Sequence, residues 1–258
     1  MNRKVKIIFS FILTIIIFFA IFKNHNWFIE FINSLNKSFY RTLIEEDRYV
    51  LILEGLKSTL IISLFSIIFG TFLGSILFLL KKSKIKIFNI LSSIVVNILQ
   101  GTPVTVLLLI FYYVIFGTIN INPIMVAIIT FSVYFSAYVS EIFSGAYASI
   151  NKAQIYSAYS MGFTKFQTLK YVILPQVLAY VIPVFKNESV SLIKSTSIAG
   201  YISIMELTKA SDIIRYRTYE AFFPLILTAI IYFLICLTIS KILDFAYKKI
   251  DSRAVKRA

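Results

Sequence analysis

Charged and hydroxyl side chains occur within one otherwise apolar stretch, residues 186–204, KNESVSLIKSTSIAGYISI. Glu188 could accept hydrogen bonds from a cationic group, and Lys194 could donate them to an anionic one. Because charged groups are costly in hydrocarbon, these side chains should face the interior of a helix bundle or an aqueous cavity. The stretch is therefore the best candidate for a solute pathway. The alternative is that Glu188 and Lys194 only reach the membrane surface or pair with neighbours.

The single Cys and the single His of the chain limit its chemistry. A metal cluster or a disulfide framework needs several ligands or partners, so we expect no metal site and no catalytic residue. Cys236 lies in the apolar run ICLTIS and is expected to be a packing residue. His25, between two Asn residues, is expected to be an interfacial polar residue.

Membrane spans are the elements that would position the polar residues. Hydrophobic residues make up 59% of the 258 residues, which is outside a soluble composition. Because a bilayer core takes about 20 apolar residues as a helix, we predict an all-α integral membrane protein with about six transmembrane helices. The predicted spans are 6–22, 55–80, 102–117, 124–147, 186–204 and 221–243. The first lacks a small-residue cleavage site and is predicted to be an uncleaved anchor.

The distribution of basic residues predicts the orientation. The presumed inner segments 1–6, 81–86, 151–186 and 241–258 hold 3, 4, 4 and 6 basic residues. The presumed outer segments, 23–50 and 205–220, hold 7 basic and 7 acidic residues. Both termini are therefore predicted to be cytoplasmic. The net charge of +14 then belongs mainly to a cytoplasmic surface, and we expect no nucleic-acid partner.

The apolar stretch 85–117 is too long for one crossing and contains QGTP at 100–103. Gly101 and Pro103 predict a helix boundary there, since Pro removes a backbone donor and restricts its predecessor. Before the break, apolar and polar side chains occupy separate helix faces, which fits a helix along the inner membrane surface or packed on other spans. The apolar face has Ile87, Leu91, Ile94, Val95 and Ile98; the polar face has Asn89, Ser92, Ser93 and Asn97. The alternative is one tilted, kinked helix.

Gly70 and Gly74 are four residues apart in the second predicted span, with Ser66 one turn earlier. Small residues at this spacing favour close helix approach in membranes. The contact could lie within the chain or in a dimer, and the sequence leaves both open.

Residues 156–175, YSAYSMGFTKFQTLKYVILP, predict a helical hairpin between the fourth and fifth spans. Thr164 and Gln167 have the spacing of a capping box, and Gly162 supplies the turn. Pro175 is expected to end the second helix or bend it into the next element. The exposed face should bind a soluble partner protein. The alternative is a structured loop that rests on its own membrane domain.

Gly162, nine further residues and then Val172-Ile173-Leu174-Pro175 are similar to the coupling-loop signature of ATP-binding-cassette importer permeases. The chain resembles the polar amino acid permeases of that superfamily, of the histidine, glutamine, arginine and opine type. The matching blocks are 54–77, 100–113, 138–150, 187–198 and 205–211. The resemblance implies a five-helix permease domain over 49–250 with a coupling hairpin at about 152–176. An anchor and connector at 1–48 precede it, and a basic tail at 251–258 follows.

The resemblance also implies roles for individual residues. The residues expected to contact an ATPase are Tyr156, Ser157, Ala158, Gly162, Phe163, Phe166, Leu174 and Pro175. Those expected to line the substrate pathway are Asn187, Glu188, Lys194, Thr196, Ser197 and Glu141. Those expected to pack helices together are Gly70, Gly74, Gly101 and Pro103. A carboxylate of Glu188 and hydroxyls of Thr196 and Ser197 could hold the two ends of a zwitterion. For Glu141 the alternative is a structural cap or ion pair.

The chain departs from the family pattern at three points. Tyr156 stands where the family has the Glu of Glu-Ala-Ala, so no carboxylate is available there for contact with an ATPase. Gln100 stands where Arg is frequent, and Ser195 where an acidic residue is frequent. The last change lies in the predicted pathway and bears on solute preference.

The function implied is ATP-driven import of polar amino acids by alternating access. The chain would be a non-enzymatic subunit of a homo- or heterodimeric permease in a bacterial cell membrane. Its partners would be cytoplasmic ATPase subunits, which hold ATP and Mg, an extracytoplasmic solute-binding protein and membrane lipid. Consistent with this, the chain has no phosphate-binding G-x-x-x-x-G-K-[S/T] motif and needs no cofactor of its own.

Four other functions fit the sequence less well. A secondary transporter would favour internal repeats with paired broken spans, and none is evident. A membrane enzyme is disfavoured by the scarcity of His, Cys and clustered intramembrane acids. An exporter or sensor subunit, or a permease for another small solute, remains as an alternative. The sequence leaves open which amino acid is carried and what residues 23–50 do.

Overall fold

The computed structural model describes residues 25–255, and within that range the regular secondary structure is helical, without strands. This confirms the all-α prediction. The helices are α2 (His25–Phe39), α3 (Tyr49–Lys81), α4 (Lys86–Gly101), α5 (Val104–Leu109), α6 (Pro123–Ala148), α7 (Lys152–Ser160), α8 (Lys165–Thr168), α9 (Leu174–Ser195), α10 (Leu207–Thr218) and α11 (Phe222–Val255). Short π-helical or 3₁₀ segments extend several of them. The predicted span 6–22 lies outside the described residues.

Four helical runs in the described part of the chain are long and apolar enough to cross a membrane: Tyr49–Lys81, Pro123–Ala148, Lys165–Ile202 and Phe222–Phe245. A fifth crossing arises if α4 and Val104–Ile115 are counted together, although the pair is bent by 105°. The prediction of a separate span at 102–117 was wrong. A helix over Val104–Ile115 is only about 18 Å long, against a hydrocarbon core of about 30 Å.

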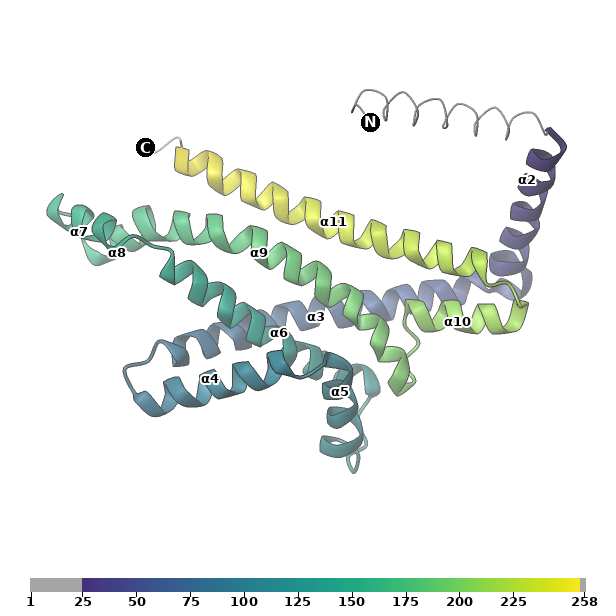
Figure 1. Ribbon diagram of the computed structural model, residues 1–258, viewed down its shortest axis with the longest axis horizontal. Helices are drawn as coiled ribbons and strands as arrows, with labels where there is room; N and C mark the ends of the chain where they lie inside the picture. The colour runs from purple at the N-terminus through teal and green to yellow at the C-terminus, as the bar shows by residue number, and fades with distance from the viewer. Residues whose placement is uncertain (1–24, 256–258) are drawn as a thin grey trace, which may run out of the picture.

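The break at QGTP arises from two extended residues. Thr102 and Pro103 have ψ angles of 128° and 133°, which end α4 and start α5. The chain is therefore not the single kinked helix of the alternative interpretation. α4 packs on α3 and α6, one of the two arrangements expected, and lies beside α3 in Figure 1. Its predicted apolar face points away from the protein, with Ile87 and Ile98 exposed, while Ser92 and Val96 are buried.

The α3–α6 contact is the centre of the molecule. A Cβ atom on Gly70 would lie 2.9 Å from the Ser132 carbonyl oxygen, and one on Gly74 would lie 2.7 Å from that of Ser136. These helices therefore approach as closely as their backbones allow, and dispersion contacts hold them together. The small-residue face predicted on the second span thus packs inside the chain. Phe131 and Phe135 of α6 are fully buried next to it.

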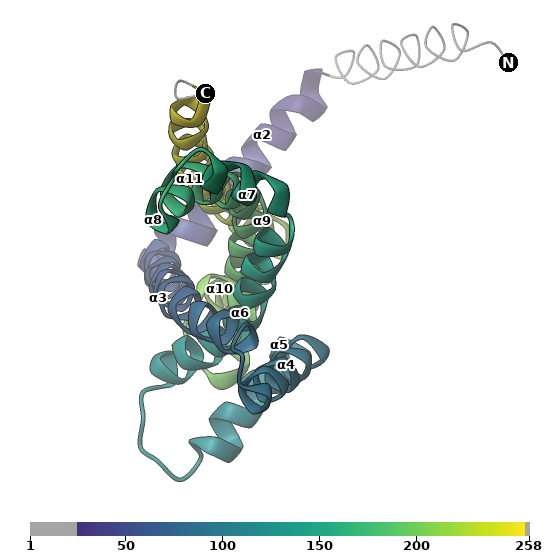
Figure 2. The same ribbon diagram turned by 90° about the vertical axis from the view of Figure 1, so that its left-hand side faces the viewer.

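The two ends of the bundle differ in which segments they contain. One end has the α3–α4 turn, the α7–α8 hairpin and the C-terminal part of α11, whereas the other has α2 and α10 (Figure 1). Seen from the first end, α7 and α8 lie in front of the long helices (Figure 2). The described segments that the charge distribution assigned to the inner side are thus together at one end.

α9 and α11 lie side by side along much of their lengths (Figure 1). The Lys186 ammonium and the Asp244 carboxylate are 2.7 Å apart and link the two helices. The predicted boundary at residue 250 does not coincide with a helix end, because α11 continues to Val255. The predicted span 186–204 is likewise only the second half of a longer helical run.

Candidate functional site

The first arm of the hairpin is α7, which begins with a side-chain cap. The Asn151 carboxamide oxygen accepts a hydrogen bond from the Ala153 amide at 2.9 Å. Asn is among the preferred capping residues because it satisfies an amide that has no partner within the helix. At the other end, the Met161 amide donates to the Ser157 carbonyl at 3.0 Å. Ala158 is buried against the second arm, and Tyr156 and Ser157 are exposed.

Gly162 makes the turn with φ = +82°, a left-handed conformation that favours glycine. Its amide donates to the Tyr159 carbonyl, and the Phe163 amide donates to the Ala158 carbonyl at 3.0 Å. A Cβ atom on Gly162 would meet nothing within 4 Å. The glycine is therefore needed for its backbone conformation and not for space.

The capping box predicted for the second arm is present. The Thr164 amide donates to the Gln167 side-chain oxygen at 2.8 Å, and the Gln167 amide donates to the Thr164 hydroxyl at 3.2 Å. The box starts α8 directly after the turn, so the angle between the two arms is fixed by local hydrogen bonds.

Of the two outcomes predicted for Pro175, an end of the second helix was wrong, and the helix instead passes into the next element. α8 continues through a π-helical segment, Leu169–Ile173, into α9, and Pro175 lies in the first turn of α9, where a missing amide is tolerated. The Leu174 amide donates to the Leu169 carbonyl, five residues earlier. Pro183 lies inside α9. The second arm and the predicted pathway span are therefore one helical run, Lys165–Ile202.

The predicted pathway residues other than Glu141 lie on the C-terminal half of this run. Asn187 and Lys194 are exposed and Glu188 is half-buried, whereas Thr196 is fully buried. The hydroxyls of Thr196 and Ser197 donate to the carbonyls of Ile193 and Lys194, at 2.7 and 2.8 Å. Both hydroxyl protons are used by the helix in this conformation, and the predicted role of the two hydroxyls in holding a solute stays a prediction.

Two tyrosines that sequence reasoning did not single out lie on α6, which packs against the helix of Glu188, α9. The hydroxyls of Tyr134 and Tyr138 are 3.0 Å apart. The sequence signal is a pair of tyrosines four residues apart in a span, which places both on one helix face. Glu188 and the tyrosine pair provide one carboxylate and two hydroxyls between α6 and α9.

Glu141 forms an ion pair with Lys81 at the C-terminal end of α3, as in the alternative interpretation of this residue. The Asn89 side chain donates to the Lys81 carbonyl, so α3, the α3–α4 connection and α6 are joined here. Glu141 follows Tyr138 by three residues on α6, and its carboxylate is engaged in this contact between helices.

Glu206 is a second carboxylate that the sequence did not single out. It is 1% exposed and accepts hydrogen bonds from the amides of Thr208 and Lys209, at 2.7 and 2.6 Å, and from the Tyr232 hydroxyl at 3.2 Å. The first two cap α10, and the third joins α10 to α11. Burial raises the pKa of Glu206 above its usual value, and these hydrogen bonds oppose that rise.

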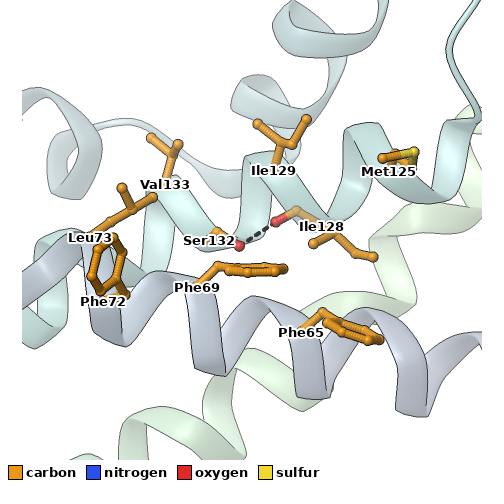
Figure 3. A pocket seen from close by; sticks show the side chains of 9 residues that line it. All are labelled: Phe65, Phe69, Phe72, Leu73, Met125, Ile128, Ile129, Ser132 and Val133. Carbon is orange, nitrogen blue, oxygen red and sulfur yellow. Dashed lines mark hydrogen bonds between the residues drawn. The ribbon is translucent and has the colours of Figure 1, made fainter.

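An apolar cavity of about 450 Å³ lies on the outside of the α3–α6 pair. Its walls include the stacked rings of Phe65 and Phe69, together with Phe72, Met125 and Ile129 (Figure 3). Its one hydroxyl, that of Ser132, already donates to the Ile128 carbonyl at 2.6 Å. The cavity therefore offers no polar group for a charged solute and is unlike the α6–α9 region.

Ionisable side chains within a membrane-spanning helix, such as Glu188 in the run Lys165–Ile202, mark solute or ion pathways in membrane proteins. The family model described as the binding-protein-dependent transport system inner membrane component matches residues 66–256. The chain belongs to this family, the permease subunits of ATP-binding-cassette transporters, whose ATPase activity is in separate subunits.

Individual relatives cover most of the chain. A putative glutamine transport system permease protein of Rickettsia bellii is 32% identical over 79% of this chain and 94% of its own length. An L-cystine transport system permease protein of Bacillus subtilis is 32% identical over 83% and 92%. A crystal structure of an amino acid ABC transporter with histidines has a TM-score of 0.70 at 32% identity, covering 80% of this chain and 97% of that one.

Proposed function

We propose that this protein is the permease subunit of an importer for polar amino acids, in which a separate ATPase binds the hairpin at 152–176. The continuity of the hairpin with the pathway helix carries this proposal. Because Lys165–Ile202 is one helical run, a displacement of the hairpin is passed directly to the residues beyond Lys186. The relatives named for glutamine and cystine support an amino acid as the solute.

The solute route would run between α6 and α9, past Glu188 of α9 and the Tyr134–Tyr138 pair of α6. A carboxylate suits the ammonium group of an amino acid, and tyrosine hydroxyls can donate to its carboxylate. Asn187 and Lys194 would line the route on the same helix. Burial in a membrane protein makes such polar groups costly unless they serve a solute or one another, which supports this assignment.

The proposal includes the orientation and the partners. The end that holds the hairpin, the α3–α4 turn and the C-terminal part of α11 would face the cytoplasm, because it concentrates the basic residues. ATP and Mg would be bound by the ATPase subunits. A second permease chain and an extracytoplasmic solute-binding protein would complete the complex in the bacterial inner membrane.

Transport by the purified components tests the proposal. The full-length protein is reconstituted into proteoliposomes with its ATPase subunit and solute-binding protein, and uptake of radiolabelled glutamine, arginine, histidine and cystine is measured. We expect uptake of at least one of them only with ATP and an active ATPase. A hydrolysis-deficient ATPase serves as the control. Uptake at the full rate without any ATPase would show a secondary transporter instead.

A further inference from the structure

The α7–α8 hairpin carries charge of only one sign. Residues 152–176 include Lys152, Lys165 and Lys170 and no Asp or Glu. All three lysines are exposed, and none is paired with a carboxylate within residues 25–255. Lys170 lies 5.4 Å from the ring centre of its neighbour Tyr171. The hairpin therefore presents three positive charges with no internal neutralisation.

The same hairpin exposes large apolar side chains. Met161, Phe166 and Tyr156 are 75%, 70% and 66% exposed, and Met161 adjoins the Gly162 turn. Tyr156 and Met161 precede the run Lys165–Ile202, and Phe166 is its second residue. Clustered exposure of this kind marks an interaction surface. Apolar side chains at the centre with charges around them is also the composition of a protein interface.

The position of the hairpin favours a protein over the lipid surface as its partner. The run Lys165–Ile202 has 38 residues, which as a helix is about 57 Å long, against a hydrocarbon core of about 30 Å. A large part of the run therefore extends beyond the apolar layer and carries the hairpin with it. Figures 1 and 2 show α7 and α8 at the extreme end of the molecule.

Charge complementarity then defines the partner surface. We infer that the hairpin binds a groove on the ATPase subunit that has an apolar floor for Met161 and Phe166 and a rim of carboxylates for Lys152, Lys165 and Lys170. This inference rests on the proposed function and adds the chemistry of the ATPase groove. Rim charges act mainly on association and its salt dependence, whereas buried apolar anchors set the lifetime of a complex.

Charge reversal tests the acidic rim. The full-length protein is placed in nanodiscs of zwitterionic lipid, and the Kd for its purified ATPase subunit is measured at low and high salt. We expect Lys152→Glu/Lys165→Glu/Lys170→Glu to weaken binding about 3- to 100-fold at low salt, with a much smaller effect at high salt. The Gln triple variant at the same positions should be intermediate.

A matched control separates the hairpin from net charge. Lys37→Glu/Lys209→Glu/Arg217→Glu changes the charge equally at three exposed residues of α2 and α10, at the opposite end of the molecule. We expect this variant to bind the ATPase as the unmodified protein does. A Lys-for-carboxylate substitution in the ATPase groove should restore affinity to the hairpin variant.

The apolar floor has its own test. Phe166→Ala should weaken binding about 10-fold or more at every salt concentration, mainly through faster dissociation. Phe245→Ala is the control, since Phe245 of α11 is 71% exposed and lies outside the hairpin.

Three results would contradict the inference in distinguishable ways. Unchanged ATPase affinity in both hairpin variants would overturn the acidic and apolar groove. A second result is that ATPase affinity stays unchanged while the Glu triple variant, in nanodiscs, no longer binds vesicles of anionic phosphatidylglycerol. That result would show that the three lysines bind lipid and not the ATPase. Failure of the unmodified protein to bind any ATPase would overturn the proposed function itself.

Discussion

The α3–α6 contact and the α7–α8 hairpin are both built around glycine, for opposite reasons. At Gly74 the facing helix leaves no room for a Cβ atom, while the space around Gly162 is open and only the backbone conformation demands glycine. The first region is held by contacts between distant parts of the chain, and the second by hydrogen bonds within a few residues. Stability should therefore depend on the first region and coupling to a partner on the second.

The largest effect is expected for Gly74→Val. A Cβ atom there would lie 2.6 Å from the Val139 Cβ and 2.7 Å from the Ser136 carbonyl oxygen, neither of which can rotate away. We expect a loss of about 3 kcal/mol or more in the free energy of unfolding. The unfolding temperature and the yield of folded protein in detergent measure it. Gly101→Val is the control, because a Cβ atom there meets nothing within 4 Å.

Gly162→Val tests the other side of the comparison. A non-glycine residue at φ = +82° costs about 1–3 kcal/mol, and more for a β-branched side chain, but the strain falls on the hairpin alone. We expect the unfolding temperature of the membrane domain to change less than in Gly74→Val. The ratio of solute imported to ATP hydrolysed should fall several-fold. Equal ratios in Gly162→Val and Gly101→Val would show that the turn is not needed for coupling.

An effect of intermediate size is expected at Glu206, a buried carboxylate that joins α10 and α11 at the end of the molecule away from the hairpin. Its pKa is raised, so the folded protein binds the proton more tightly than the unfolded chain does. The contribution of this group to stability is therefore fully present below about pH 4.5 and is lost as the pH rises through the folded pKa. The measurement is the unfolding temperature from acid to neutral pH. We expect this contribution to fall with rising pH in the unmodified protein and to be absent in Glu206→Gln.

The carboxylate itself should also matter at neutral pH. Glu206→Gln places amide hydrogens toward the donors of α10 or Tyr232, which should cost about 1–2 kcal/mol. Tyr232→Phe removes one of the three donors and should cost less. A larger loss in Tyr232→Phe than in Glu206→Gln would mean that the contact with α11 matters more than the cap.

The smallest effect is expected for the Lys186–Asp244 ion pair between α9 and α11. The two side chains are 25% and 50% exposed, so solvent screens the attraction and the coupling energy should be about 0.2–1 kcal/mol. A double-mutant cycle with Ala at both positions, read by thermal unfolding, isolates it. A coupling energy above this range would mean that the ion pair holds α11 firmly to α9, the helix that continues from the hairpin.

Local patterns predicted local structure well. The capping box of Thr164 and Gln167 and the turn at Gly162 involve residues within a few positions of each other, and both are present. The break at Thr102 and Pro103 follows for the same reason. Composition alone was sufficient for the all-helical membrane fold, because few arrangements satisfy the backbone in lipid.

Features that depend on distant contacts were not predicted. The hydrogen bond between Glu206 and Tyr232 joins residues 26 positions apart, and no spacing rule indicates it. Pro175 looked like a helix end, but the neighbouring π-helical turn and its place in the first turn of α9 let the helix continue. The hydroxyls of Thr196 and Ser197 turned back to their own helix, which residue type alone does not reveal.

The long helical run through α9 has a mechanical consequence that follows from the position of Pro183. Proline is the usual site of a bend within a helix, and it divides Lys165–Ile202 into segments of about 27 and 28 Å. Pro183 therefore lies near the middle of the run, with the hairpin on one side and the predicted pathway residues on the other. A displacement of the hairpin by a partner would have to pass this joint, so the stiffness of the helix at Pro183 would limit how much of the movement reaches the predicted pathway residues.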